Sequence, residues 1–360
     1  MSTGNISTAA TTAGIDVSKN IQLASLVIYC IISAVGILGN GLVIYVTGFR
    51  MKRTVNSVWF LNLALADFLF TTFLIFTIIS YSQHFHWPFG LFVCKINTLV
   101  TVVNMFASIF LLTAISLDRC LAICVVVWAQ NKRTVCKAQI ICAVIWVAAV
   151  ACSAPFATLR EVHTSGDSIY CIYSESLTSE KDLTLKIFRF LMGFLLPFLV
   201  IFVSYVAIGV RAGRLQRSRK KRPRRIIFSI VFAFFICWFP FHVMQFIEFK
   251  VKSHNNFVMI GAPLTVCLAF MNSCLNPILY VFMCDEFQKK LKQSICFVLE
   301  SALAEDHLSF MSSRSLSSHF SKSSRKSDSV APLERKDTST TLTFMECKAV
   351  ITDENEAVCT

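Results

Sequence analysis

The 360-residue chain is 55% hydrophobic and 15% charged, with a mean hydropathy of +0.63 and a formal net charge of +13. Soluble globular proteins carry about a quarter charged residues, so this composition excludes that class and indicates an integral membrane protein. The basic excess does not indicate nucleic-acid binding, because the Lys and Arg residues gather beside the ends of apolar segments.

Seven apolar segments are each long enough to cross a bilayer as a helix. They are residues 22–48, 57–82, 91–124, 136–158, 184–212, 224–249 and 257–283. Basic clusters follow the first, third, fifth and seventh segments, which places those loops and the C-terminal tail in the cytoplasm. We therefore predict an all-α integral membrane protein, with a seven-helix transmembrane domain over residues 22–283 and an extracellular N-terminus.

The expected outer side carries three modification candidates. Residues 1–21 are polar and form the expected extracellular N-terminal segment, in which Asn5-Ile6-Ser7 is an acceptor sequon for glycosylation of Asn5. Cys94 begins the third segment, and Cys171 lies in the polar loop after the fourth. These are the two cysteines that fall in the oxidising outer compartment, so we predict a disulfide between them.

Two charged sites lie within or at the end of apolar segments. Asp67 sits inside the second segment, where burial of an ionisable group is costly. It is either a hydrogen-bonded structural carboxylate or a cation ligand with Ser108, Asn272 and Asn276. The Asp118-Arg119 pair lies about 36 Å along the third helix from Cys94, at the opposite membrane face; read alone, it also fits a solvated helix end.

The fifth, sixth and seventh segments contain polar or helix-bending residues. Arg189 lies about two turns before Pro197, where its side chain either reaches the headgroups or serves a binding site. Pro240 follows a Trp-Phe pair in the sixth segment, and Pro277 follows Asn276 in the seventh. Each proline removes a backbone hydrogen bond and favours a kink.

The chain beyond the seventh segment divides into two expected parts. Residues 284–299 alternate apolar and basic positions at helical spacing, which predicts an amphipathic eighth helix on the inner membrane lipid, with Cys296 as a candidate acylation site. Residues 300–360 are rich in Ser, Thr and charge, which predicts a disordered cytoplasmic tail. Its hydroxyl runs suit phosphorylation, and a passive low-complexity tail is the alternative.

The motifs in their order resemble those of a rhodopsin-like (class A) G-protein-coupled receptor. The resemblance rests on Gly39-Asn40, LNLALAD, Cys94 with DRC, Trp146, CWFP and NPILY. The stretches NSVWFLNLALADFLF, DRCLAI, VWAQNKRTV and NSCLNPILYVFM are similar to the chemoattractant branch, notably the chemerin receptor (chemokine-like receptor) and the formyl peptide receptors.

This resemblance implies a set of activation switches and an allosteric sodium ion, with no required cofactor. Asp118 and Arg119 would form an inner lock, from which Arg119 is released towards Tyr205 and a heterotrimeric G protein. Trp238 would be the toggle beneath the ligand. The further implied switches are Pro240, Asn276, Pro277 and Tyr280. The implied sodium ligands are Asp67, Ser108, Asn272 and Asn276.

The same resemblance implies where a ligand binds. Val102 stands where formyl peptide receptors carry an acid, whereas Arg160 and Arg189 match basic residues that receive a peptide's C-terminal carboxylate in the chemerin receptor. The full implied ligand-binding set is Thr101, Val102, Met105, Arg160, Arg189, Phe241, His242, Gln245 and Glu248. Thr101 occupies the position of the amine-binding aspartate, which argues against an amine receptor.

We therefore expect a cell-surface receptor for an extracellular chemoattractant, either a chemerin-like peptide or a related peptide or lipid mediator. Coupling to an inhibitory-type G protein would drive leukocyte chemotaxis or inflammatory signalling, and the tail would engage receptor kinases and arrestin. A non-signalling scavenger receptor is one alternative, because Val126 stands where relatives have proline, and a formyl peptide receptor is another. A transporter is disfavoured because the sequence shows no repeat, and no enzyme motif is present.

Overall fold

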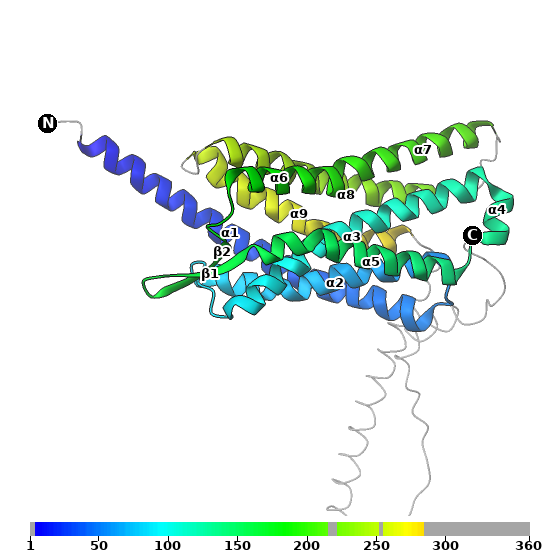
Figure 1. The fold of residues 1–360 in the computed structure, drawn as a ribbon, viewed down its shortest axis with the longest axis horizontal. Coiled ribbons are helices and arrows are strands. Elements are labelled where there is room, and N and C mark those ends of the chain that lie inside the picture. The colour runs from blue at the N-terminus through cyan, green and yellow to red at the C-terminus, as the bar shows by residue number, and fades with distance from the viewer. Residues whose placement is uncertain (1–3, 215–221, 252–254, 284–360) are drawn as a thin grey trace, which may run out of the picture. The chain divides into compact units, whose positions relative to one another are not determined.

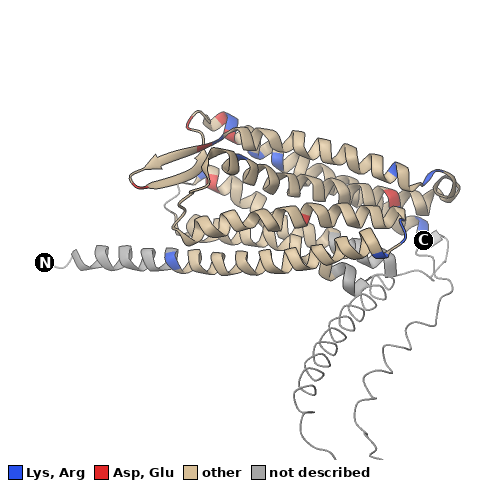
Figure 2. Cartoon of the chain, turned by 90° about the horizontal axis from the view of Figure 1, so that it is seen from below, with Lys and Arg blue, Asp and Glu red and all other residues tan. Residues whose placement is uncertain are grey.

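The computed structural model describes residues 4–214, 222–251 and 255–283. Within these ranges, seven helices are long and apolar enough to cross a membrane, as the sequence predicts. They lie alongside one another (Figure 1). The charged residues gather mainly at the ends of the helices (Figure 2), which is the arrangement that an apolar bilayer interior requires.

The helix bounds agree with the predicted segments to within a few residues for most spans. Helix α1 covers Gly4–Tyr45 and continues into the π-helical turn η1, Val46–Arg50. The next spans are α2 (Val55–Ser82), α3 (Gly90–Cys124) and α5 (Val135–Thr158). The last two are α8 (Arg222–Lys250) and α9 (Asn256–Met283).

Two spans differ from the prediction in detail. Helix α1 begins at Gly4 rather than near residue 22; the residues between contain no proline that would stop a helix. The fifth span is not one regular helix but α6 (Ser179–Phe190), the π-helical turn η2 (Leu191–Leu195) and α7 (Leu196–Arg214) in succession. Such π-helical turns inside helices are frequent at functional sites.

Two short elements form where the sequence predicts only loops. Helix α4 covers Val126–Lys132, and strands β1 (Arg160–Ser165) and β2 (Ser168–Tyr173) form an antiparallel hairpin. Gly166 turns the hairpin at φ +59°, a conformation that glycine adopts without steric cost. The hairpin and α4 lie at opposite ends of the bundle (Figure 1). We call the hairpin end, which the sequence predicts to face outward, the outer end, and the other the inner end.

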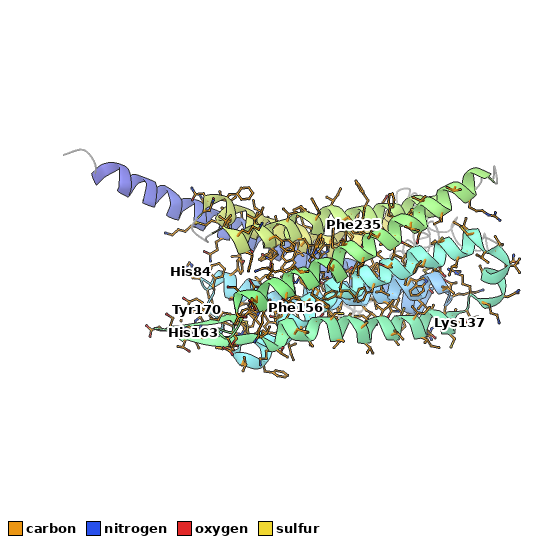
Figure 3. All side chains as sticks on the ribbon, turned by 45° about the horizontal axis from the view of Figure 1, so that its top comes forward. His84, Lys137, Phe156, His163, Tyr170 and Phe235 are labelled. Carbon is orange, nitrogen blue, oxygen red and sulfur yellow. A yellow bond between two sulfur atoms is a disulfide. The ribbon has the colours of Figure 1, made fainter. Side chains whose placement is uncertain are left out.

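Helix α3 is the central helix of the bundle. Its most apolar window is 67% buried, against 28–44% for the other six spans. Side chains fill the space between the helices, and on α5 Phe156 lies towards the outer end whereas Lys137 lies towards the inner end (Figure 3). Helix α3 therefore links the outer end of the bundle to the inner end.

Close packing joins α1 to α2 and α9. A Cβ placed on Gly36 would lie 2.3 Å from Cγ2 of Thr71, so a larger residue could not occupy this position without movement. Four residues later, Nδ2 of Asn40 donates to the carbonyl oxygen of Ser273 at 2.9 Å. The glycine and the amide thus determine how near these three helices approach.

Candidate functional site

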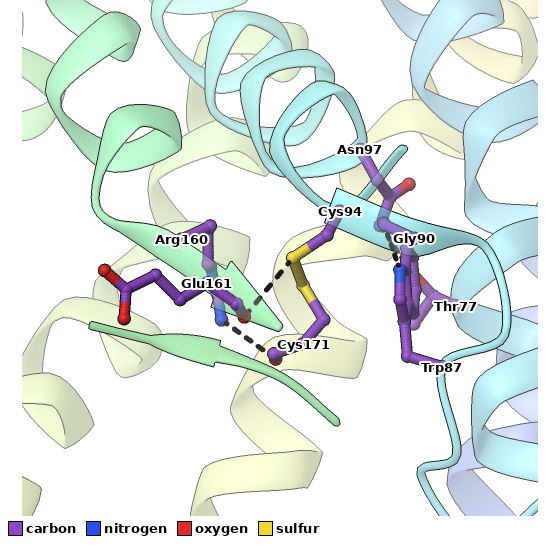
Figure 4. The surroundings of a disulfide bond; sticks show 8 residues. All are labelled: Thr77, Trp87, Gly90, Cys94, Asn97, Arg160, Glu161 and Cys171. Atoms are coloured by element: carbon purple, nitrogen blue, oxygen red, sulfur yellow. Dashed lines mark hydrogen bonds between the residues drawn. A yellow bond between two sulfur atoms is a disulfide. The ribbon is translucent and has the colours of Figure 1, made fainter. Parts of the chain in front are cut away.

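The outer hairpin is fixed to α3 by a disulfide. Cys94 and Cys171 are bonded, with their Cα atoms 5.8 Å apart, which confirms the predicted pair (Figure 4). The segment before α3 is also attached, because the backbone N–H of Trp87 donates to the carbonyl oxygen of Ile169 at 2.7 Å. These two connections hold the hairpin against the outer end of the central helix.

Two arginines that the sequence predicts as ligand-binding residues lie among aromatic rings at this end. The Arg160 guanidinium carbon lies 3.8 Å from the centroid of Tyr173, its cross-strand neighbour in the hairpin. The Arg189 guanidinium carbon lies 4.2 Å from the centroid of Phe156 and 5.8 Å from that of Phe241. We call these five residues the arginine cluster. Arg189 therefore stacks within the bundle, which argues against the alternative that it reaches for the headgroups.

The arginine cluster is electropositive. The ion pairs of the described chain are Arg133–Asp118 and Lys186–Asp182, so neither cluster arginine has a carboxylate partner there. The Nε atoms of Arg160 and Arg189 are buried without a hydrogen-bond acceptor among the described residues. Burial alone would raise the pKa of Tyr173, but the nearby charges of Arg189 and Arg160 outweigh burial and lower that pKa.

The other predicted ligand-binding residues surround or lie below this cluster. His242 is 2% exposed, near the rings of Phe190 and Phe194. Val102 and Met105 are buried on α3. Three of these side chains already have partners: Gln245 donates to Glu248 at 2.9 Å, and Thr101 donates to the carbonyl oxygen of Asn97 at 2.8 Å.

A buried polar cluster surrounds Asp67 near the middle of α2. Asp67 is 0% exposed, and its two carboxylate oxygens accept hydrogen bonds from Nδ2 of Asn104 at 2.9 Å and from Nδ2 of Asn276 at 2.7 Å. Ser108 and Asn272 are also buried, and the Ser108 hydroxyl has no partner among the described residues. Asn104 was not among the predicted ligands, although its position one turn before Ser108 on α3 places it on the same helix face.

A second polar network lies at the inner end. The Asp118 carboxylate accepts two hydrogen bonds from Arg133, from Nε at 2.8 Å and from Nη2 at 2.9 Å. The amide oxygen of Asn56 accepts from Nη2 of Arg133 at 2.7 Å and also from Nη2 of Arg119.

Arg133 is a partner of Asp118 that the predicted lock between Asp118 and Arg119 did not include. Arg133 is the C-cap residue of α4, and from there its side chain reaches the Asp118 carboxylate of α3. The sequence carries no spacing signal for this pair, because the two residues belong to different elements.

The remaining predicted switches lie on α8 and α9. Trp238 is 5% exposed and stacks on Phe234, with 5.9 Å between ring centroids. Pro240 and Pro277 lie inside their helices, as predicted. Several predictions lie outside what the structure describes. They concern the side chains of Asn5 and Tyr280, the eighth helix 284–299 with Cys296, and the tail 300–360.

Seven spanning helices, an outer hairpin bonded to the third span and a polar network at the inner end define a seven-helix membrane receptor. The chain matches the family described as the 7 transmembrane receptor (rhodopsin family) over residues 39–280. It therefore belongs to the rhodopsin family of seven-transmembrane receptors, in the chemoattractant branch that its relatives define. Accordingly, it is a multi-pass plasma-membrane receptor and not an enzyme.

Three similar proteins represent the relatives. Chemerin-like receptor 1 of Sus scrofa is 40% identical over 326 residues, which cover 85% of this chain and 90% of the relative. Formyl peptide receptor 2 of Mus musculus is 40% identical over 308 residues, covering 81% and 88%. The C3a anaphylatoxin chemotactic receptor of Danio rerio is 39% identical over 294 residues, covering 80% of each chain.

Proposed function

We propose that the chain is a receptor for an extracellular chemoattractant whose negatively charged terminus docks on the arginine cluster. The ligand is a chemerin-like peptide or a related peptide or lipid mediator. The observation that carries this proposal is the pair of guanidinium groups, Arg160 and Arg189, without a carboxylate partner in the described chain.

The physical reason is the cost of a partly buried cation that no carboxylate neutralises. An ion taken out of water without a partner is penalised by several kcal/mol, and a ligand carboxylate would offset that cost. The planar guanidinium group presents paired N–H donors that match the two oxygens of a carboxylate. The ring of Phe156 holds Arg189 in place from one side, so little side-chain freedom remains to be lost on binding.

The names of the relatives refer to chemerin, formyl peptide and an anaphylatoxin. They support a peptide ligand but do not distinguish between these three kinds. The residue at the acid position of formyl peptide receptors is Val102, which is buried and apolar here. This side chain cannot supply the acidic group, and so we favour the chemerin-like alternative over a formylated peptide.

Signal transfer takes place as a population shift, in which agonist binds the active state more tightly than the inactive one. At the inner end, activation releases Arg119 from Asn56 towards Tyr205 and an inhibitory-type G protein. Arg133 shares the acceptor Asn56 and neutralises Asp118, so α4 is coupled to the same switch.

The buried carboxylate fits an allosteric sodium ion. Sodium is a hard cation that prefers oxygen ligands, as calcium and magnesium do. The oxygens of Asp67, Ser108, Asn272 and Asn276 would hold it, and the unpartnered Ser108 hydroxyl supplies an acceptor that the described chain does not use. The ion would neutralise the Asp67 charge in the inactive state.

The proposed inner partners act on residues beyond α9. Receptor kinases would phosphorylate the Ser and Thr runs of residues 300–360, and arrestin would bind the resulting polyanion. Residues 284–299 would lie on inner-leaflet lipid through their basic and apolar faces.

One screen tests the proposed function. Cells that express the full chain are exposed to chemerin-type peptides, formylated peptides and lipid mediators, and both ligand binding and inhibitory G-protein dissociation are measured. We expect binding and dissociation with a carboxylate-ended peptide or an anionic lipid. Binding without dissociation would instead identify a scavenger receptor, and a response to formylated peptides alone would overturn the ligand proposal.

A further inference from the structure

Two free thiols lie together at the inner end of α3. Cys120 and Cys124 are one helical turn apart, and their sulfur atoms are 4.0 Å from each other. Both residues are partly exposed. Cys124 also approaches α7, where its sulfur lies 3.9 Å from the carbonyl oxygen of Ala207. The pair therefore sits at the seam between α3 and α7.

The geometry suits a bridging atom better than a disulfide. Residues four apart on a helix have Cβ atoms about 5–6 Å apart, whereas a disulfide needs about 3.5–4.5 Å. Direct oxidation would thus distort the last turn of α3. An atom inserted between the two sulfurs needs no such approach, because bonds of about 2.3 Å from each sulfur span the observed 4.0 Å separation.

We propose that Cys120 and Cys124 form a bidentate site for a soft, thiophilic metal or metalloid centre. Thiolate ligands select soft centres. With a trivalent arsine oxide as the bound species, two S–H bonds break and two As–S bonds form. The arsenic-bound oxygen leaves with both protons as water, so no electrons are transferred and no oxidant is required.

A group bound to these two thiols would lie where it can interfere with activation. Cys120 directly follows Arg119, and Ala207 lies two residues after Tyr205. A group held on both sulfurs occupies the seam between α3 and α7, the helices that carry Arg119 and Tyr205, and so hinders the movement of these two helices in the proposed activation. Occupation therefore blocks coupling to the G protein, whereas the ligand site at the outer end is unaffected.

The binding test uses the full chain in membranes and phenylarsine oxide as the probe. Peptide mapping by mass spectrometry should find one phenylarsenic group across Cys120 and Cys124. A 1,2-dithiol such as ethanedithiol should remove it, while an equal concentration of a monothiol should not, because only the dithiol can form a competing chelate. Cys120→Ser and Cys124→Ser should each abolish the monothiol-resistant adduct. Cys136→Ser, which removes an exposed thiol at the start of α5, should leave it unchanged.

The signalling test follows from the same treatment. Phenylarsine oxide should abolish agonist-stimulated nucleotide exchange with unchanged agonist binding, and ethanedithiol should restore it; the Cys124→Ser receptor should resist the reagent. An adduct that persists in Cys124→Ser, or that a monothiol removes, would overturn the binding site. An adduct on the pair that leaves exchange intact would overturn the blocking role alone. Neither result depends on whether the outer ligand is a peptide or a lipid, so failure here is distinguishable from failure of the proposed function.

Discussion

Replacing Arg189 by alanine should weaken a carboxylate-ended agonist by a measurable factor. The guanidinium is partly buried, stacks 4.2 Å from the centroid of Phe156 and has no ion pair in the described chain. Removing one partner of a desolvated charge pair costs about 2–5 kcal/mol of binding free energy. Because Arg189 keeps some exposure, we expect the lower half of that range, roughly a thirty- to several-hundred-fold rise in Kd.

A thermodynamic cycle separates this contact from a general disturbance of the receptor. Amidation of the agonist's C-terminus removes the carboxylate charge from the other side, so it should weaken binding to the unmutated receptor by a similar factor. The amidated agonist should bind Arg189→Ala hardly worse than the free acid does, because both changes remove one interaction. Radioligand competition on membranes measures all four affinities.

Two variants complete this experiment. Lys186 lies one turn before Arg189 on α6 but is already paired with Asp182, so Lys186→Ala should change the affinity by about fivefold at most. Arg189→Lys keeps the charge without the planar fork and should fall between alanine and arginine. Full additivity of the Arg189→Ala and amidation losses, or equal affinities for acid and amide in the unmutated receptor, would refute the assignment of Arg189 as the anchor.

Four further predictions test other parts of the molecule. Asp67→Asn should abolish the fall in agonist affinity that we expect when sodium replaces a bulky organic cation; a sodium-insensitive unmutated receptor would remove the hypothesis. Cys171→Ala should strongly reduce functional surface receptor, measured by antibody labelling and agonist response, and unchanged values would contradict the hairpin's role. Truncation before Leu308 should leave G-protein activation intact but reduce arrestin recruitment, and normal recruitment would place the phosphorylation sites elsewhere. Gly36→Val should lower the melting temperature of the purified receptor because its Cβ would clash with Thr71; a conservative Gly48→Val control, at a position with nothing within 4 Å, should have a smaller effect.

Composition and hydropathy were sufficient to predict the seven membrane spans and, through the topology, the disulfide. A bilayer interior offers no hydrogen-bonding partners, so any spanning segment must be apolar and helical, and that requirement is visible in a local window of sequence. The disulfide followed because the predicted topology left two cysteines on the outer side. The short elements were missed for a related reason: α4 and the hairpin lie outside the apolar segments, where this requirement does not apply.

Side-chain partners were predicted less well than side-chain positions. The sequence singled out Asp67, Asp118 and Arg189, and all three lie at polar or charged sites in the structure. It did not reveal that Asn104 donates to Asp67, that Arg133 binds Asp118, or that Arg189 stacks on Phe156.

The sequence by itself therefore determined the membrane class, the order of the helices and the receptor family, because these depend on local composition and on motifs read along the chain. The tertiary structure alone decided which charges are paired and which remain available to a ligand. Arg133 and Asp118 meet because α4 packs beside α3. Arg160 lies over Tyr173 because the two strands of the hairpin pair, and Arg189 of α6 lies over rings that α5 and α8 supply. Such contacts depend on how closely distant elements approach, and no local pattern encodes that distance.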